Sequence, residues 1–277
     1  MTELTPEPGR GLGENELPSY AEALHAFHAA AASELSVLHA ALPLSPRSLV
    51  LDLACGDGCH GVRMAERAGR VVGLDRSSAY LHAARARGLA SVVQANAAAL
   101  PFADGTFDLA FCAHSLGSLP DHRAALAEMA RVTGRDGWIA ILESDPLHRV
   151  LMPWDPRLEL EVRRAQLDGL EALAREHGMP LDKFTCARRL DRLLSSLGFD
   201  DCRLQTLVVE RRSPLGPDEE LFLRGYLADV RARASPHLGG EHRRALEALT
   251  SPDSPAYLPR QTAFRYLQLE TLALARR

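Results

Sequence analysis

Five short apolar runs alternate with helix-like stretches between residues 48 and 143, and this alternation limits the possible folds more than any other feature. The expected strands are Leu49–Leu53, Val71–Leu74, Ser91–Ala95, Phe107–Ala113 and Trp138–Glu143. The expected helices between them are Gly58–Ala68, Ser78–Arg87 and Asp121–Val132. Strands that recur about every 20 to 30 residues with helical connections predict a parallel sheet that helices cover on both faces.

The sequence on either side of this region has different patterns. Before it, apolar positions at steps of three and four predict one helix from Ser19 to about Leu42, which Pro43 ends. After Glu143, prolines interrupt the rhythm. The last segment, 263–274, alternates imperfectly, which predicts an edge strand and leaves a terminal helix as the rival. The elements expected in between are helices at 157–176 and 185–197, a strand at 202–210 and a helical stretch at 217–249.

Composition and charge exclude several classes of function. A net charge of −4, with arginines in ones and twos, argues against a nucleic-acid surface. No apolar run approaches the roughly 20 residues that cross a bilayer, and residues 1–18 lack a signal-peptide core, so we expect a cytoplasmic protein that binds no membrane. Cys55 and Cys59 lie four residues apart, but neither a second pair nor a set of histidines completes a zinc site, and we expect no metal.

The segment from Leu49 to Gly58 is an apolar strand that opens into a glycine-bearing turn and then a helix. Glycines let the backbone approach a ligand closely, and a helix N-terminus attracts anionic groups. Seventeen residues after Gly58, a second apolar strand ends in Asp75. Its carboxylate can accept hydrogen bonds from both ribose hydroxyls of an adenosine. Each feature alone is common, but together at this spacing they predict a nucleoside cofactor.

The spacing of the turn separates two kinds of cofactor. A dinucleotide loop has the pattern G-x-G-x-x-G, whereas this series is Ala54-x-Gly56-x-Gly58, a wider turn that suits the methionine tail of S-adenosylmethionine. A short-chain dehydrogenase also needs a tyrosine four residues before a lysine. The single lysine, Lys183, has Met179 at that position. A nicotinamide-dependent oxidoreductase is therefore the weaker alternative.

Three motifs together resemble the class I S-adenosylmethionine-dependent methyltransferases, in particular the small-molecule group that includes the quinone-biosynthesis methyltransferases. They are Leu-Asp-Leu-Ala-Cys-Gly-Asp-Gly at 51–58, Val-Val-Gly-Leu-Asp at 71–75, and the run at 96–108 that begins Asn-Ala and ends Phe-Asp. The resemblance covers about residues 48–145. It implies S-adenosyl-L-methionine as cofactor and S-adenosyl-L-homocysteine as product.

The resemblance also implies which positions hold that cofactor. They are Asp52, Ala54, Gly56 and Gly58 at the methionine end, Asp75 at the ribose, Arg76, Asn96 and Ala97 at the adenine, and the backbone of Cys112 and Ala113 at the methionine amino group. Ala54 stands where the family usually has glycine, which a turn without positive φ at that position accepts. Asn96 stands where aspartate is commoner, and its amide oxygen can still accept a hydrogen bond from the adenine amino group.

Catalysis of methyl transfer needs few residues. The enzyme must hold the acceptor atom, the methyl group and sulfur in line, and a general base is needed only where the acceptor has to lose a proton. His114 is the candidate base because it follows the fourth strand at the rim of the sheet; its rival role is to shape the pocket. Tyr20, on the N-terminal helix, contacts the cofactor carboxylate or belongs to the core.

We therefore expect a single α/β domain with a Rossmann-like, doubly wound, mostly parallel seven-stranded sheet, its last strand antiparallel, and helical cap insertions. It would transfer methyl to an oxygen, nitrogen or carbon atom of a small organic molecule, as a monomer or homodimer. A non-catalytic S-adenosylmethionine-binding protein is a further alternative. The expected segments are a flexible leader (1–18), an N-terminal helical cover (19–47), the cofactor-binding core (48–145), a helical lid (146–184) and C-terminal core strands (185–277) with a helical insertion (213–260).

Overall fold

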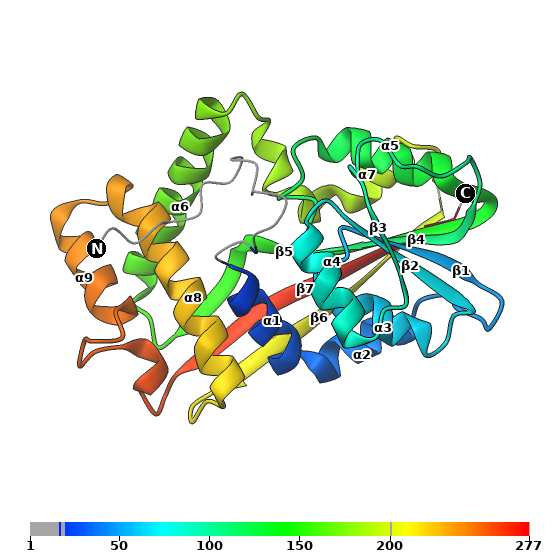
Figure 1. The fold of residues 1–277 in the computed structure, drawn as a ribbon. Helices are drawn as coiled ribbons and strands as arrows, with labels where there is room; N and C mark the ends of the chain where they lie inside the picture. Colours follow the sequence, from blue (N-terminus) through cyan, green and yellow to red (C-terminus); the bar gives the residue numbers. More distant parts are fainter. Residues whose placement is uncertain (1–16, 18–19, 200, 277) are drawn as a thin grey trace.

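The computed structural model describes residues 17, 20–199 and 201–276, so the expected leader lies almost wholly outside the described residues. Its centre is a seven-stranded sheet with the order β3-β2-β1-β4-β5-β7-β6 (Figure 1). β1 to β5 pair in parallel, and β7 runs antiparallel to both β5 and β6, as expected. The strands are β1 Leu49–Leu53, β2 Arg70–Asp75, β3 Ser91–Gln94, β4 Phe107–Ala113, β5 Thr133–Met152, β6 Asp201–Arg212 and β7 Arg265–Arg276.

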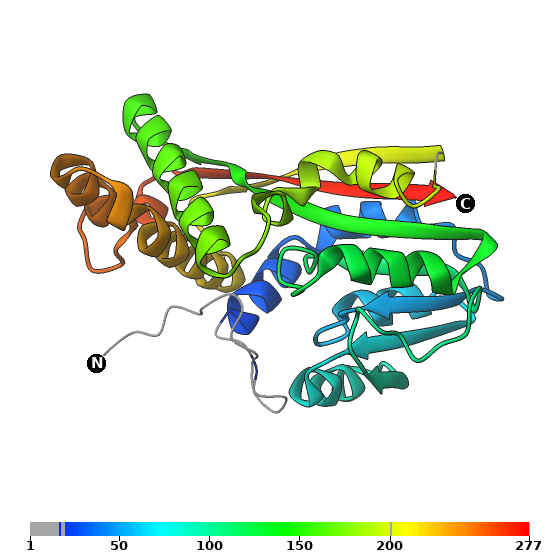
Figure 2. The same ribbon diagram turned by 90° about the horizontal axis from the view of Figure 1, so that it is seen from above.

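Helices cover both faces of this sheet (Figure 2). Successive residues of a strand point to opposite faces, and in β4 Leu109 and Phe111 join one core cluster while Ala110 and Cys112 join the other. The first cluster includes side chains of α1 to α4, α6 and α8, and the second those of α5 and α7. The helices are α1 Ala21–Ala30, α2 Ala32–Ala40, α3 Cys59–Ala65, α4 Ser78–Arg87, α5 His122–Val132, α6 Pro156–Glu176, α7 Leu190–Ser195, α8 Pro217–Ala234 and α9 Gly240–Thr250. In the part of the chain that the structure describes, none of them is long and apolar enough for a membrane span.

The fifth strand is longer than expected. β5 continues past Glu143 to Met152, so the expected lid boundary at 145/146 falls inside a strand. The pairing with β7 shifts register between Ser144 and Arg149, and Pro146, which has no amide to donate, lies in this irregularity. β5, β6 and β7 thereby extend the sheet beyond its parallel half, toward α6, α8 and α9 (Figure 1).

The last strand occupies a different position from the expected one. β7 is not at the edge, because it lies between β5 and β6, and β6 is the edge strand. The prediction was wrong because an interior strand has apolar side chains on both faces, which blurs the two-residue alternation. Leu272, Ala273 and Ala275 are all buried.

The predicted helix from Ser19 to Leu42 is two helices, and this expectation was also wrong. α1 and α2 are separated at Ala31, whose backbone (φ −95°, ψ 16°) leaves the helical range. α1 packs against α8, whereas α2 packs against β6. The periodicity of apolar residues cannot show that α1 and α2 pack against different elements. The helical stretch 217–249 is likewise divided, into α8 and α9, by a turn at 235–239.

Candidate active site

The loop between β1 and α3 carries the glycines that predicted a cofactor. Three of its residues have left-handed backbone: Ala54 (φ 53°), Gly56 (φ 51°) and Gly58 (φ 75°). The expectation of a turn without positive φ at Ala54 is therefore wrong. The amide of Cys55 donates to the carbonyl of Leu74 at 3.0 Å, and this bond to β2 helps hold the loop in a conformation that costs an alanine about 1–2 kcal/mol.

Asp75, at the end of β2, joins this loop to the next one. Its Oδ2 accepts from the amide of Gly56 at 3.0 Å, and its Oδ1 accepts from the amide of Ser77 at 2.9 Å. Burial raises the pKa of this carboxyl group, and the backbone amides oppose the rise. An ionised carboxylate has about four acceptor positions, so it keeps acceptor capacity beyond its bonds to backbone amides for the hydroxyls of a ligand.

Asp52 is an unusual buried acid at the end of β1. Its side chain is 1% exposed, and Oδ2 has no hydrogen-bond partner among the described residues. Burial, together with repulsion from Asp75, raises the pKa of Asp52 to about 8. A buried, unpaired acceptor oxygen is costly, and a ligand ammonium group would satisfy it.

The residues expected at the adenine lie where β2 and β3 end. Gln94 donates from Nε2 to the carbonyl of Arg76 at 3.0 Å, which ties the two strand ends together. Asn96 is exposed, and its Oδ1 accepts from the amide of Ala98 at 3.0 Å. That oxygen therefore keeps one acceptor position for a ligand. Ala97 is buried in the neighbouring core.

The end of β4 completes the rim of the loop. Cys112 points into the core, so only its backbone is available, while Ala113 accepts a hydrogen bond from Ser115 Oγ at 2.8 Å. Burial raises the pKa of Tyr20, just before α1, and the nearby side chain of Ser118 opposes the rise. The start of the N-terminal cover therefore lies near the loop that follows β4.

His114 follows β4 and is held at both ring nitrogens. Its Nε2 lies 2.7 Å from Oε2 of Glu270, and its Nδ1 lies 3.1 Å from Nε2 of His28. The side chain is 8% exposed. Burial lowers the pKa of His114, but the charge and hydrogen bond of Glu270 outweigh it, so the pKa is raised overall. His114 also has a left-handed backbone (φ 49°), which directs it away from the strand.

Glu270 is a residue that sequence reasoning missed. It lies on β7, 156 residues from His114, and is fully buried. Tyr266, Gln268 and Glu270 form a chain of hydrogen bonds along one face of the strand, with Tyr266 donating to Gln268 and Gln268 to Glu270. The sequence does contain a pattern that points to it: Tyr266, Gln268 and Glu270 are polar side chains at a two-residue period within an apolar segment.

Glu143 and Asp145 organise loops. Oε1 of buried Glu143 accepts from the amides of Ser115 and Leu116, both at 2.8 Å, and thereby shapes the turn after His114. Asp145 accepts from the amide of Leu147 at 2.7 Å and also forms an ion pair with Arg188. These carboxylates hold the backbone around the site.

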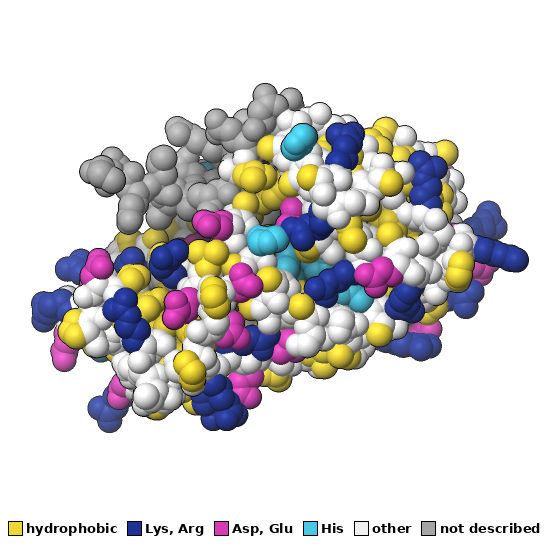
Figure 3. Space-filling model, turned by 60° about the horizontal axis from the view of Figure 1, so that its bottom comes forward, with side chains coloured by type: hydrophobic (Ala, Val, Ile, Leu, Met, Phe, Trp, Pro, Cys, Tyr) yellow, Lys and Arg dark blue, Asp and Glu magenta, His cyan; other side chains and the backbone are white. Residues whose placement is uncertain are grey.

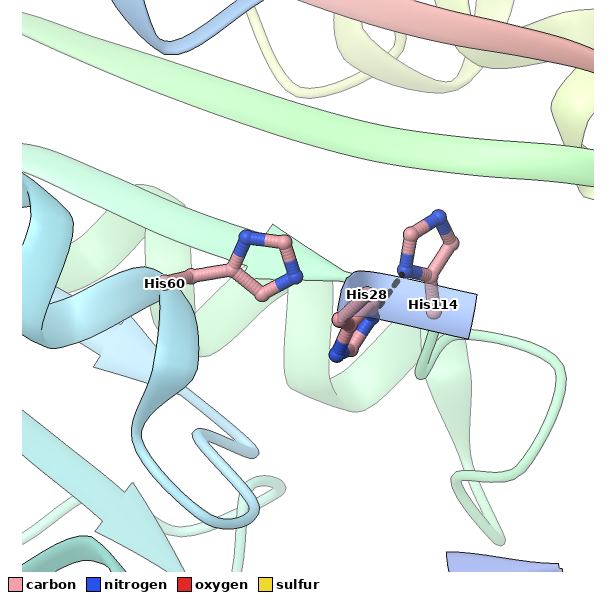
Figure 4. A group of neighbouring side chains, drawn as sticks. All are labelled: His28, His60 and His114. Carbon is pink, nitrogen blue, oxygen red and sulfur yellow. Dashed lines mark hydrogen bonds between the residues drawn. The ribbon is translucent and has the colours of Figure 1, made fainter. Parts of the chain in front are cut away.

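Three histidines from separate elements meet beside this loop: His28 from α1, His60 from α3 and His114 (Figure 4). One ring nitrogen of each lies within 4.8 Å of the other two. Burial, reinforced by neighbouring positive charge, lowers the pKa values of His28 and His60 well below the usual histidine value. Both rings are therefore neutral near pH 7. Histidine side chains are also visible near the centre of one face of the molecule (Figure 3). Sequence reasoning had expected neither a cluster nor a metal here.

Two surface clefts, of about 400 and 910 Å³, lie elsewhere. The first is lined by the opening residues of four strands, and the second includes Thr133, where β5 begins. They therefore lie at the amino edge of the parallel strands. In open α/β sheets ligands bind at the carboxyl edge, where the loop after β1, Asp75 and His114 lie.

Comparison with known proteins covers mainly the parallel half. A family model described as a methyltransferase domain matches residues 51–141. The demethylmenaquinone methyltransferase of Corynebacterium glutamicum (strain R) is 32% identical over 185 residues, which is 64% of this chain and 80% of that protein. The enzyme of the same name from Mycolicibacterium vanbaalenii is 40% identical over 111 residues, 40% of this chain and 48% of that protein. The chain thus spans about half the length of several of the curated relatives that it matches.

Solved structures share the fold. A Bacillus halodurans protein superposes with a TM-score of 0.54 at 19% identity, over 88% of this chain and 98% of its own. The phosphoethanolamine N-methyltransferase 2 of Haemonchus contortus has a TM-score of 0.52 at 14% identity, over 92% of this chain and 56% of its own. Identities this low establish the common architecture alone.

Fold and site together define a Rossmann-like α/β protein with a glycine-bearing loop at the carboxyl edge of its sheet. The curated relatives narrow that class. The chain belongs to the class I S-adenosylmethionine-dependent methyltransferases, in the group related to quinone biosynthesis, and S-adenosyl-L-methionine is the cofactor of this family.

Proposed function

We propose that this protein transfers the methyl group of S-adenosyl-L-methionine to an oxygen, nitrogen or carbon atom of a small organic acceptor. The observation that carries the proposal is Asp75, which braces the loop after β1 while keeping acceptor positions for a ribose diol. A cytoplasmic location, the absence of nucleic-acid and membrane partners, and a monomeric or dimeric state stay predictions.

The residues of the site fit the parts of the cofactor. Asp75 would accept from the ribose hydroxyls, and the unpaired Oδ2 of Asp52 would favour the ammonium group of the methionine tail. Left-handed backbone at Ala54, Gly56 and Gly58 exposes the loop for close approach. We assign Arg76, Asn96 and Ala97 to the adenine, Cys112 and Ala113 to the amino group, and Tyr20 to the cofactor carboxylate.

When bound, the cofactor supplies a methyl group on a positively charged sulfur. The lone pair of the acceptor would form the new bond to the methyl carbon, and the sulfur would keep the electron pair of the carbon–sulfur bond that breaks. The protein contributes alignment and exclusion of water. The helical cover and the loop after β4 exclude water from this rim. His114, oriented by Glu270, is the residue that we assign to the acceptor's proton.

The acceptor itself is left open. The first curated relatives carry the name demethylmenaquinone methyltransferase, but they match this chain over only 102 to 111 residues. Outside the parallel half, α8 packs against both α1 and α6, and these helices lie beyond residues 51–141, which the family model matches. A demethylmenaquinone therefore belongs in the panel of acceptors to be tested, beside small alcohols, thiols, amines and carboxylates.

Calorimetry with S-adenosyl-L-methionine, S-adenosyl-L-homocysteine and NAD tests cofactor choice. We expect Asp75→Asn to weaken binding of the first two by about 10-fold or more, because a charged acceptor becomes neutral. The matched control is Asp136→Asn, whose side chain is 94% exposed and should bind as the wild type does. NAD binding by the wild type, or no effect of Asp75→Asn, would disprove the proposal.

Formation of S-adenosyl-L-homocysteine with the acceptor panel tests catalysis. In His114→Gln we expect kcat to fall by about 100-fold or more, the usual size of a lost acid–base contribution, while the affinity for the cofactor is unchanged. Cofactor binding without turnover of any acceptor would instead favour a non-catalytic binding protein.

A further inference from the structure

His28, His60 and His114 have the arrangement of a metal-binding histidine set. Each comes from a different element, and each turns one ring nitrogen toward the other two (Figure 4). Histidines that bind a metal almost always have the second ring nitrogen held by a carboxylate, carbonyl or other polar group, which fixes the tautomer.

His114 and His60 are both fixed from behind. Nε2 of His114 faces the carboxylate of Glu270 at 2.7 Å, so it carries the proton and leaves the lone pair on Nδ1, which accepts from Nε2 of His28. Nδ1 of His39 donates to the carbonyl of Leu35 at 2.7 Å. In the neutral ring, Nε2 of His39 must then accept from Nδ1 of His60, 3.0 Å away. This relay leaves the lone pair of His60 on Nε2.

His60 has a buried ring nitrogen with no hydrogen-bond partner in the described part of the chain. Its side chain is 6% exposed, and Nε2 has no hydrogen-bond partner among the described residues. His28 and His114 hydrogen-bond to each other, whereas the acceptor nitrogen of His60 is buried without a donor. A buried and unsatisfied imidazole nitrogen that faces two other imidazoles is the feature that a metal ion would satisfy.

The third ring completes the set. Nε2 of His28 donates to Nδ1 of His114 at 3.1 Å, and Nδ1 of His28 lies 3.0 Å from Sγ of Cys59. Metal binding would require the other tautomer of His28, in which Nδ1 donates to Sγ of Cys59 and Nε2 carries the lone pair. The rings of Phe27 and Phe111 pack against His114 and His60, with centroid distances of 5.7 and 5.6 Å. An apolar shell of this kind excludes solvent and strengthens metal–ligand interactions.

We propose that His28 Nε2, His60 Nε2 and His114 Nδ1 bind one divalent transition-metal ion of the zinc type. Tetrahedral zinc with bonds of about 2.0–2.1 Å separates its nitrogen ligands by about 3.3 Å. The 3.1 Å between His28 and His114 already matches this spacing, and the upper bound of 4.8 Å for the cluster requires a contraction of at most about 1.5 Å. Three imidazole ligands suit zinc and its neighbours rather than magnesium or calcium.

The inferred metal gives the acceptor a chemical class, and this step rests on the proposed function. Three protein ligands leave the fourth position of a tetrahedral ion open. A hydroxyl or thiol bound there has its pKa lowered, as metal-bound water does, and releases its proton to solvent. The resulting oxygen or sulfur lone pair forms the bond to the methyl carbon. With the metal bound, His114 would act as a ligand, and the role of proton acceptor proposed above would apply to the metal-free protein.

Metal binding can be measured without turnover. The full-length protein, freed of metal by a chelator, is titrated with Zn²⁺ alone in a calorimeter, and its Tm is measured with and without Zn²⁺. We expect one Zn²⁺ per chain and a rise in Tm, because a ligand that binds only the native state stabilises it. His60→Ala should weaken Zn²⁺ binding at least 100-fold and abolish the rise. Glu270→Gln, which keeps a hydrogen-bond acceptor but loses the charge, should weaken binding about 10- to 100-fold.

The control is His82→Ala, an exposed histidine on α4, which should bind Zn²⁺ like the wild type. If His60→Ala does not fold, Glu270→Gln and His28→Gln decide the matter. Absence of stoichiometric Zn²⁺ binding by the wild type, or equal binding by the histidine variants, overturns the inference. S-adenosyl-L-methionine binding, measured separately, reports on the proposed function, so failure of one does not imply failure of the other.

Discussion

Single residues around the cofactor loop owe their roles to neighbours in space. Asp75 was predictable, because an acid at the end of an apolar strand is a local pattern. Ala54 was not, because its left-handed backbone is maintained by hydrogen bonds to other strands, such as that between Cys55 and Leu74. Glu270 contacts His114 across 156 residues of chain. The position of Asp75 follows from the local sequence, whereas the roles of Ala54 and Glu270 depend on how the strands pair.

Ala54→Gly is expected to raise the free energy of unfolding by about 0.5–1 kcal/mol, because relief of the left-handed backbone exceeds the added entropy of the unfolded chain. Ala54→Val should lower it, because a β-branched side chain tolerates positive φ poorly. Urea unfolding followed by circular dichroism measures both. Ala31→Gly, at a φ of −95°, is the control and should only destabilise. A less stable Ala54→Gly protein would contradict the strain argument.

Elements in this protein are positioned by contacts that local periodicity does not contain. Arg211 on β6 hydrogen-bonds to Glu34 on α2 at 2.7 Å and also to the carbonyl of Ala30 at the end of α1. The arginine thereby binds both sides of the break at Ala31. The carbonyl of Ala30 therefore accepts from a side chain, as carbonyls at the end of a helix often do.

The pair of Glu34 and Arg211 predicts a pH dependence of stability. The Arg211 hydrogen bond lowers the pKa of Glu34 from 4.5 to about 2. A lower pKa in the folded state means that the contribution is present above pH 4.5 and is lost as the pH falls toward 2. Glu34→Gln should therefore cost about 1 kcal/mol at pH 7, a value discounted for solvent screening of this partly exposed pair.

Urea unfolding of the wild type and Glu34→Gln at pH 7 and pH 3 checks this prediction. The difference between the two proteins should shrink at the lower pH. Glu66→Gln, at an exposed position on the chain, serves as the matched control and should show little change at either pH. A difference that is constant with pH would mean that the ion pair is not its cause.

At the scale of the whole molecule, two segments far apart in the chain close over the same rim. α1 and α8 pack against each other, and an added Cβ at Gly225 would lie 2.8 Å from Cβ of Ala23. This close approach positions α1, which carries His28, beside His60 and His114. The candidate metal site therefore depends on the assembly of the N-terminal cover with the C-terminal insertion.

Gly225→Leu should separate α1 from α8. We expect a loss of about 2 kcal/mol in the free energy of unfolding from overpacking, together with weaker Zn²⁺ binding, because His28 moves with α1. Urea unfolding and the Zn²⁺ titration measure the two effects. Gly239→Leu is the control, since nothing lies within 4 Å of its added Cβ. Unchanged Zn²⁺ affinity in a folded Gly225→Leu protein would show that the packing of α1 against α8 does not position His28 for the metal.

The sequence by itself determined the parallel half of the molecule. β1 and β4 have the predicted bounds, α4 coincides with its predicted range, and the glycine loop and Asp75 identify the family. Periodicity and turn residues are local, and they report which faces of a segment are buried. For the same reason they could not show that β5 continues past Pro146, that β7 is interior, or that the N-terminal helix divides at Ala31.

Only the tertiary structure decided what surrounds the reaction. His28, His60, His114 and Glu270 are distant in sequence and become neighbours through strand order and helix packing. No local pattern records such contacts, because each depends on the free energy of burying one element against another. The strand–loop–helix motif was thus sufficient to predict the methyl donor, whereas the chemistry offered to the acceptor arises from elements that only the folded chain brings together.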